Sequence, residues 1–349
     1  MTCCRDWEIV LDEDAQADYA AAPEPLHSFI ADKLYEDEEG DVCFRLAPDG
    51  RCALLDSGGL CTIQRSWGEE HLCVHCAAYP RFIEEYGCLT ERCEAVSCPE
   101  AARLLEREGI FPLLETDDGV PDAPFPGVDG VLLAGLIASR GAAFAMLRTP
   151  DIPIWGRLAA VLRYAAALQS QLDRGAPLTA PPPAPAPSAE PWPAALQGLA
   201  CRLFALLAAL EPLDPKWPEL LRRQGARLAV MSTPDYLTLV RHGAARWPGW
   251  EEAMTHLAEY FVFRHWPKAV NDDALYGRAA LGCAACVILF HLDLLTLPDG
   301  PDEPWRRSLL WARMSREVEH LDENFFALAD ALSFLDAWPL AGILSGEAV

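Results

Sequence analysis

Cysteine is the residue type whose number and spacing in this sequence suit a chemical role. Thirteen cysteines occur in the 349 residues, and ten of them lie between Cys3 and Cys98. Thiolates are soft ligands that favour zinc, iron–sulfur clusters or Cu(I). Four converging thiolates close a tetrahedral zinc site or hold a four-iron cluster. The first third of the chain is therefore predicted to bind a metal, and scattered free thiols are the alternative interpretation.

Nine cysteines of this region are candidate ligands, because Cys43 follows an apolar, strand-like position and is expected in the core. Cys73 and Cys76 have the Cys-x2-Cys spacing of a metal-binding knuckle. Cys52 and Cys61 flank a glycine-rich turn that can bring both sulfurs to one side. The nine candidates are Cys3, Cys4, Cys52, Cys61, Cys73, Cys76, Cys88, Cys93 and Cys98.

The balance of charge limits the class of partner. The chain has 28 Lys and Arg against 52 Asp and Glu, which gives a net charge of −24. So acidic a protein repels nucleic acid, and no nucleic-acid partner is expected. A cationic ligand or a lysine-bearing protein suits the charge better, and a solvated acidic surface is the alternative interpretation.

The sequence also predicts a cytoplasmic protein with no membrane partner. Its N-terminus has neither the basic nor the apolar region of a secretory signal. The most apolar stretch, residues 279–297, is interrupted by His291 and Asp293, so it is predicted to be a buried helix rather than a membrane span. In a reducing compartment, clustered cysteines are more often metal ligands than disulfides.

The elements that carry the cysteines are expected to be short. The fold is predicted to be mainly α, a helical body with a small N-terminal cysteine-rich metal-binding module that contains short strands and turns. In the module, residues 42–46 and 61–64 are predicted as strands, and residues 67–74 and 99–108 as helices. Such a region has little apolar periodicity of its own, so a bound metal would act as its staple.

Four regions follow from the changes in composition along the chain. They are the cysteine-rich metal-binding module at residues 1–105, a helical region at 106–175, a Pro/Ala-rich linker or surface loop at 176–194 and a C-terminal helical region at 195–349. Apolar residues at helical spacing predict helices over residues 131–147, 154–172, 195–210, 217–231, 235–245, 250–266, 272–297 and 303–335.

One run in the module, RCALLDSGGLCTIQRSWGEEHLCVHCAAYPRF at residues 51–82, combines cysteines, a glycine turn and an acidic segment. Its distinctive positions are Cys52, Cys61, Gly68-Glu69-Glu70, Cys76 and Tyr79-Pro80-Arg81. This pattern resembles the signature of flagellin lysine-N-methylases. Weaker matches lie at Cys3-Cys4 with Trp7, at Cys98, near residues 260–264 and over residues 315–324.

The sequence departs from the family pattern in two places. Ala77 stands where an arginine usually follows the third cysteine, and the family usually carries further cysteines upstream of the double cysteine. A misassigned start or a natural truncation, with an incomplete metal site, is therefore expected.

The resemblance implies transfer of methyl groups from S-adenosylmethionine to lysine side chains of flagellin. It also implies a cysteine-ligated metal site, in which a four-iron iron–sulfur cluster is favoured over zinc. Tyr79 and Arg81 lie beside a ligand in the sequence and would contact the cofactor. Cys88 and Cys93 stay undecided. The implied metal ligands are Cys3, Cys4, Cys52, Cys61, Cys76 and Cys98.

The candidate catalytic residues lie near the C-terminus. With Arg316 and Asn324, residues Glu319, His320 and Glu323 fall at three- and four-residue spacing, which a continuous helix places on one face. Methyl transfer needs a neutral lysine amine, because a protonated ammonium has no lone pair, and such groups could take its proton. A solvated helix face with ordinary ion pairs is the alternative interpretation.

Two other functions stay open beside the enzyme. The chain could be a non-catalytic zinc- or iron-binding module, or a degenerate, truncated member of the family. No glycine-rich dinucleotide loop follows a predicted strand, so an ordinary Rossmann methyltransferase is not expected.

Overall fold

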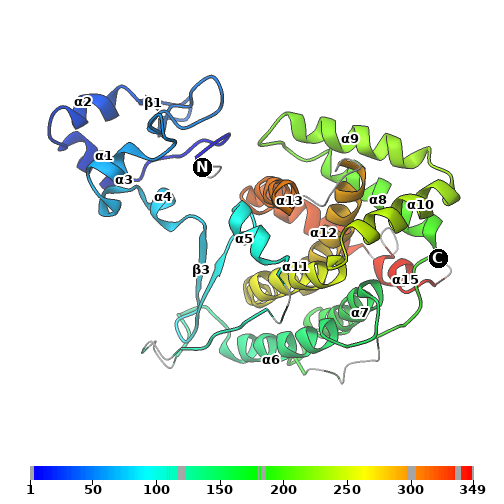
Figure 1. Cartoon of the computed structure of the whole chain (residues 1–349). Coiled ribbons are helices and arrows are strands. Elements are labelled where there is room, and N and C mark those ends of the chain that lie inside the picture. Colours follow the sequence, from blue (N-terminus) through cyan, green and yellow to red (C-terminus); the bar gives the residue numbers. More distant parts are fainter. Residues whose placement is uncertain are drawn as a thin grey trace. The chain divides into compact units, whose positions relative to one another are not determined.

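The chain folds into two compact units, which are shown with their helices and strands in Figure 1. Unit 1 consists of residues Met1–Ile83 and Arg92–Cys98, and unit 2 of Glu84–Glu91 and Pro99–Val349. Helices dominate the described residues and the four strands are short, which confirms the predicted mainly α fold. This computed structural model describes residues 4–107, 109, 111–116, 119, 123–179, 181, 186–296, 304–334 and 339–347.

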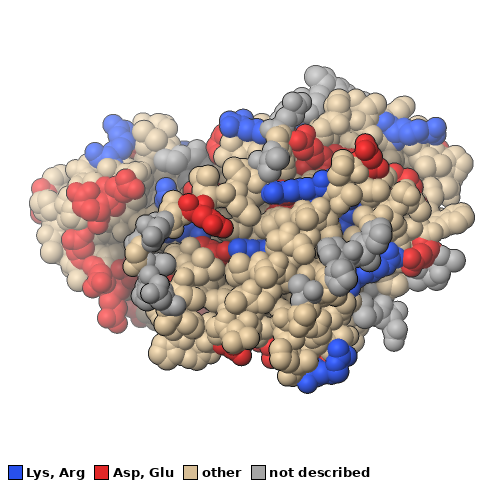
Figure 2. All heavy atoms as spheres, turned by 90° about the horizontal axis from the view of Figure 1, so that it is seen from below, with Lys and Arg blue, Asp and Glu red and all other residues tan. Residues whose placement is uncertain are grey.

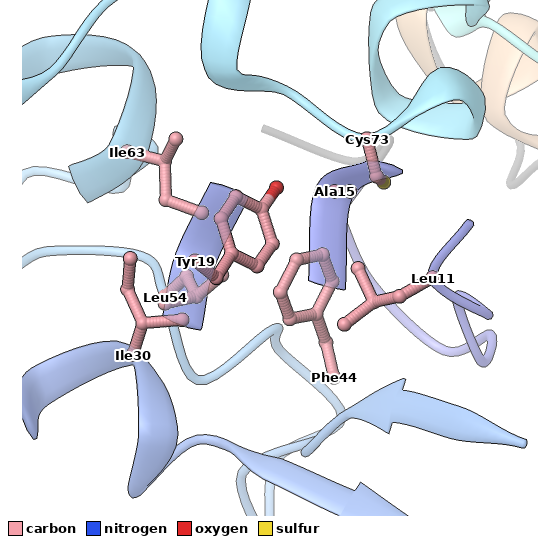
Figure 3. Packing of buried hydrophobic residues seen from close by; sticks show 8 residues of the cluster. All are labelled: Leu11, Ala15, Tyr19, Ile30, Phe44, Leu54, Ile63 and Cys73. Carbon is pink, nitrogen blue, oxygen red and sulfur yellow. The ribbon is translucent and has the colours of Figure 1, made fainter. Parts of the chain in front are cut away.

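Unit 1 is built from short elements around a small apolar core. Ala15 and Tyr19 are four residues apart on α1, so both project from the same face of the helix into the core shown in Figure 3. Strands β1 and β2 pair antiparallel, with Tyr35 opposite Cys43. The main cluster of this core consists of Leu11, Ala15, Tyr19, Ile30, Phe44, Leu54, Ile63 and Cys73. The elements are α1 (Glu13–Ala20), α2 (Leu26–Ala31), β1 (Leu34–Glu36), β2 (Val42–Phe44), α3 (Thr62–Ser66), the 3-10 helix η1 (Glu69–His71), α4 (Val74–Ala78) and the hairpin of β3 (Arg81–Glu85) and β4 (Thr90–Glu94), whose tip belongs to unit 2.

Two predictions about the module differ from its structure. The strand predicted at residues 61–64 is wrong, because α3 begins at Thr62 and turns Ile63 into the core with 1% of its surface exposed. The β-branched pair suggested a strand, but a helical turn buries the isoleucine side chain better. The helix predicted at residues 67–74 is reduced to η1, and α4 begins only at Val74.

Unit 2 is a bundle of longer helices. The helix predicted at residues 154–172 coincides with α7, and the one predicted at residues 131–147 differs from α6 by one residue at its start. The elements are α5 (Pro99–Leu104), α6 (Gly130–Leu147), α7 (Ile154–Leu172), α8 (Pro193–Leu207), α9 (Lys216–Ala229), α10 (Thr233–Arg246), α11 (Trp250–His265), the 3-10 helix η2 (Pro267–Asn271), α12 (Leu275–Thr296), α13 (Pro304–Glu319), α14 (Asp322–Ser333) and α15 (Leu340–Leu344).

Helix α12 is the centre of unit 2. It packs against α7, α11 and α14, and every residue from Leu275 to Leu295 is buried (Figure 1). Both α6 and α12 are long and apolar enough to cross a membrane by length and composition alone, but 94% of the apolar window of α12 is buried inside the protein. The buried helix predicted from residue 279 onward is therefore confirmed.

The last predicted helix is interrupted. The stretch predicted at residues 303–335 forms α13 and α14, because Leu321 adopts an extended conformation between them. Asn324 stabilises this break, since its side-chain amide donates hydrogen bonds of 2.7 Å to the carbonyls of Glu317 and Glu211. The carbonyl of Glu317 lies in the last turn of α13, where helix geometry leaves carbonyls without a partner.

Candidate metal centre

Four cysteines of unit 1 line one cavity. The cavity has a volume of about 280 Å³, and its wall includes Cys4, Cys52, Cys61 and Cys76. All four belong to the predicted set of metal ligands, and they come from four separate segments of the chain. Four thiols at one hollow are the donor set that a tetrahedral metal ion or a four-iron cluster requires.

Cys4 and Cys52 are held together by the backbone. The amide of Cys52 donates a 2.9 Å hydrogen bond to the carbonyl of Cys4, and the amide of Asp6 donates one of 2.8 Å to the carbonyl of Gly50. Gly50 has a φ of +80°, in the left-handed region that favours glycine. The turn at Gly50 thus fastens the N-terminal segment beside Cys52.

Cys61 is placed by the turn that precedes it. The carboxylate of Asp56 accepts hydrogen bonds of 2.8 Å from the amide of Gly58 and 3.0 Å from that of Leu60. Cys61 then pairs with Leu55 in an antiparallel bridge and precedes the first residue of α3. The prediction that this turn brings Cys52 and Cys61 to one side is confirmed, because both line the cavity.

Cys76 lies on α4, which is fastened to α1 through Asp12. One carboxylate oxygen of Asp12 caps α1 by accepting a 2.9 Å hydrogen bond from the amide of Ala15. The other accepts a 2.8 Å hydrogen bond from the amide of Val74, the first residue of α4. These amide donors, that of Val74 first, lower the pKa of Asp12. The position of Cys76 therefore depends on a contact between segments far apart in the sequence.

Two thiols of the cavity, those of Cys52 and Cys76, have a raised pKa. The hydrogen bond with Cys73, burial, and the charges of Cys73, Cys4 and Cys52 raise the pKa of Cys76 far above its usual range. The same hydrogen bond lowers the pKa of Cys73, so one proton is held between the two sulfurs. Burial raises the pKa of Cys52. A bound metal would replace these protons and remove the repulsion among the thiolates.

The remaining wall of the cavity is partly polar and aromatic. Tyr79 and Arg81, the residues predicted to contact the cofactor, both line it. The ring of Trp7 meets that of Tyr79 edge-on, with centroids 5.1 Å apart, and the hydroxyl of Ser97 donates a 3.3 Å hydrogen bond to the hydroxyl of Tyr79. The guanidinium of Arg81 lies 3.8 Å from the carboxylate of Glu94. A cation in this cavity would meet the aromatic rings of Trp7 and Tyr79 and the carboxylate of Glu69.

The sequence analysis did not select one residue of this wall that could take part in the chemistry. Among the described residues that line the cavity, Glu69 is the only carboxylate, and it stands with His75 and Gln64. Glu69 belongs to the Gly-Glu-Glu segment that carried the resemblance, so the motif was a signal for it. Its neighbours across the cavity come from other segments of the chain, so the spacing of residues along the sequence does not predict that they lie together.

Other predicted ligands lie elsewhere. Cys3 is outside the described residues. Cys98 is not among the residues that line the cavity, and its amide donates a 2.9 Å hydrogen bond to the carbonyl of Ala95 in the turn before α5. Its role as a ligand stays a prediction. Cys43 is fully buried in unit 1, which confirms its predicted core position.

Glu319 is at the centre of a buried polar network in unit 2. It accepts hydrogen bonds from Arg264 at 2.6 Å, His265 at 2.9 Å, Ser315 at 2.5 Å and Tyr260 at 3.0 Å. Burial alone would raise the pKa of Glu319, but these donors outweigh burial and hold it at about 2. Burial lowers the pKa of His265 to about 3, so its contact with Glu319 is a hydrogen bond from a neutral ring. A carboxylate with so low a pKa is a weak base.

The other two candidate catalytic residues do not share a helix face with Glu319. His320 lies in the break after α13, and Glu323 is exposed in the first turn of α14. Burial lowers the pKa of His320 to about 4, so it is neutral near pH 7. The expectation of one continuous face is wrong because the helix ends at Glu319. The three residues belong to unit 2, and their catalytic role stays a prediction.

Comparisons with known proteins give partial matches at low identity. The chain is 28% identical over 120 residues to the lysine-N-methylase of Salmonella typhimurium, which is 32% of this chain and 30% of that protein. It is also 28% identical over 104 residues to the flagellar biosynthetic protein FliU of Salmonella muenchen, which is 61% of that protein. The match thus spans about a third of the lysine-N-methylase and supports a distant relationship at the level of a family. No family model and no solved structure matches the chain.

Proposed function

We propose that this protein is a cytoplasmic methyltransferase that moves methyl groups from S-adenosylmethionine to lysine side chains of flagellin, with a cysteine-ligated metal centre in unit 1. One observation carries the proposal: four thiols, the aromatic rings of Trp7, Phe44 and Tyr79, and a carboxylate line a single cavity of about 280 Å³ in a chain similar to lysine-N-methylases. The flagellar substrate is suggested by the name of the second relative.

The residues present fit a metal centre. Cys4, Cys52, Cys61 and Cys76 would hold it, because thiolates are the ligands of zinc and of iron–sulfur clusters. Zinc bound tetrahedrally at 2.3 Å brings its sulfurs to roughly 4 Å from one another. Among the described side chains, no three cavity thiols lie within 4.8 Å of each other. Of the two, a four-iron cluster is favoured because the resemblance to flagellin lysine-N-methylases implies it.

The lining residues supply what methyl transfer requires. S-adenosylmethionine brings a methyl group on a positively charged sulfonium, and Trp7 and Tyr79 offer the aromatic surface that attracts such a cation. Glu69, which lines the same cavity, would accept the proton that the lysine ammonium must lose before its nitrogen lone pair attacks the methyl carbon. As the carbon–sulfur bond breaks, its electron pair stays on the sulfur of the leaving thioether.

The experiment measures metal and methylation on the same sample. The full chain, purified without oxygen, is analysed for iron, zinc and acid-labile sulfide, and is then incubated with S-adenosylmethionine and purified flagellin. We expect iron with matching sulfide and a mass gain of whole methyl groups on flagellin lysines. Glu69→Gln should lower the rate on the order of 100-fold or more with unchanged metal content, since general bases contribute at least that much.

The controls separate the enzyme from its alternatives. Cys52→Ser should remove both metal and activity, whereas Cys201→Ser, at a half-buried thiol of unit 2, should preserve both. Metal without methylation in the unaltered protein would favour a non-catalytic metal-binding module. Neither metal nor methylation would contradict the proposal.

A further inference from the structure

Tyr19 carries a buried hydroxyl whose proton has no acceptor in the described part of the chain. Only 2% of the residue is exposed. The ring is fixed by its neighbours, with centroids 6.0 Å from Phe44 and 6.3 Å from Trp67. An unsatisfied buried hydroxyl is costly, so native proteins rarely keep one without a reason.

Three cysteines of unit 1 act on the hydroxyl, and two of them line the cavity of the metal centre. Figure 3 shows the hydroxyl at the edge of the apolar core, turned to the side on which Cys73 lies. Beside burial, the charges of Cys73, Cys76 and Cys61 act on it, and they raise the pKa of Tyr19. Of these three, Cys76 and Cys61 line the cavity. The backbone group that interacts with the phenol is the amide of Cys73, itself a donor, which cannot take the proton of the hydroxyl.

We propose that Tyr19 is a positioning residue of the metal centre, whose hydroxyl donates a hydrogen bond to the sulfur of Cys76 once that sulfur is a metal-bound thiolate. The inference rests on the metal centre of the proposed function. A thiol is a weak acceptor, but a thiolate carries the negative charge that makes an acceptor strong. Hydrogen bonds to ligating atoms orient the ligand and adjust its basicity. Cys76 is favoured over Cys61 because its side chain is hydrogen-bonded to that of Cys73, the cysteine toward which the hydroxyl is turned.

This role makes the hydroxyl favourable in one state and costly in the other. Without metal its proton has no acceptor among the described residues, so removing the hydroxyl should leave the metal-free fold unchanged or more stable. With metal it supports a ligand, so removing it should weaken binding. If Tyr19 only packed in the core, Tyr19→Phe would not weaken metal binding, because phenylalanine preserves the ring and its packing.

The test is a zinc competition on the full chain. Wild type, Tyr19→Phe and Tyr164→Phe are titrated with Zn²⁺ against a chromophoric chelator without oxygen, and the metal-free proteins are melted. Tyr164, in unit 2, is the matched control, since it is also buried and its hydroxyl also lacks a partner among the described residues. We expect Tyr19→Phe to lower zinc affinity roughly 10-fold and not to lower the melting temperature of the metal-free chain. Tyr164→Phe should leave zinc affinity unchanged.

Each contrary outcome has a distinct meaning. Equal zinc affinity in Tyr19→Phe and wild type would overturn the role of Tyr19 while preserving the metal centre. A lower melting temperature of the metal-free Tyr19→Phe protein, or an equal loss of affinity in Tyr164→Phe, would make the effect a general one of packing and would also overturn it. A wild-type chain that takes up no zinc and, when purified without oxygen, holds no iron with sulfide would remove the metal centre itself, and with it both proposals.

Discussion

Unit 1 and unit 2 differ in the size of the apolar core that stabilises each of them. Unit 1 has about 90 residues with 18 acidic and seven basic side chains, so acidic groups gather on its surface (Figure 2), and the main cluster of its core has eight buried residues among those described. Unit 2 buries a whole helix, α12, at its centre. Apolar burial contributes roughly 25 cal/mol per Å², so a small core leaves little surplus over the entropy lost on folding. We therefore expect unit 2 to fold on its core alone, and unit 1 to depend on the proposed metal centre.

Removal of the metal should have the largest effect and should fall on unit 1. A structural zinc site contributes about 10–16 kcal/mol in small modules, which is as much as the whole stability of a typical domain. We therefore expect Cys76→Ser, or a strong chelator, to abolish protection from hydrogen exchange in peptides of residues 11–78. Peptides of α12 should stay protected. Hydrogen exchange read by mass spectrometry measures both units in one sample.

The control for this substitution is Cys286→Ser, a thiol buried in α12 whose sulfur lies 3.5 Å from the carbonyl of Met254. It should alter exchange in unit 2 and leave unit 1 protected. Unit 1 that remains protected in chelator would show that its small apolar core is sufficient, and the comparison between the units would fail.

A cavity in α12 should have the next largest effect and should fall on unit 2. Leu292 is fully buried in this helix. Leu292→Ala should lower the free energy of unfolding of unit 2 by about 2–5 kcal/mol, because the lost side chain leaves a hole that the bundle fills only in part. Urea unfolding followed by far-UV circular dichroism measures this, since unit 2 holds the long helices. Metal content per chain should stay at the wild-type level, and a parallel loss of metal would show that the units are not independent.

The two units also differ in how far the sequence predicts them. Helix α7 coincides with its prediction because its apolar residues recur at helical spacing and its burial follows from the same pattern. In unit 1, the prediction that Cys52 and Cys61 converge succeeded because a local turn joins them. Cys76 and Glu69 reach the same cavity through long-range contacts such as that of Asp12 with Val74, and no local pattern encodes these.

The sequence also did not predict the break between α13 and α14, because this break depends on a long-range contact. The residues around it read as continuous helix, since neither proline nor glycine interrupts them. The break is stabilised by Asn324, whose partner carbonyls include that of Glu211, far away in the sequence. Tertiary contacts of this kind override local helix propensity.

The smallest predicted effect concerns pH and belongs to unit 2. Burial lowers the pKa of His291 from 6.5 to about 4, and the neutral ring is hydrogen-bonded to the hydroxyl of Tyr236 at 2.9 Å. Between pH 6.5 and 4 the unfolded chain therefore binds a proton at this position that the folded chain excludes. The neutral ring of His291 makes its full contribution to the free energy of unfolding above pH 6.5, and this contribution is lost as the pH falls toward 4. It amounts to at most about 3 kcal/mol.

Metal-free protein allows this effect to be measured, because acid also displaces metal from thiolates. Urea unfolding of unit 2 at several pH values between 7 and 4.5 should show stability falling as the solution becomes more acidic. His291→Gln cannot take up the proton, so its stability should fall less steeply, although it starts lower at pH 7. His242→Gln, at an exposed position of the same unit, removes an imidazole without touching the core and should follow the wild type. Equal slopes for His291→Gln and wild type would mean that this histidine does not couple the core of unit 2 to pH.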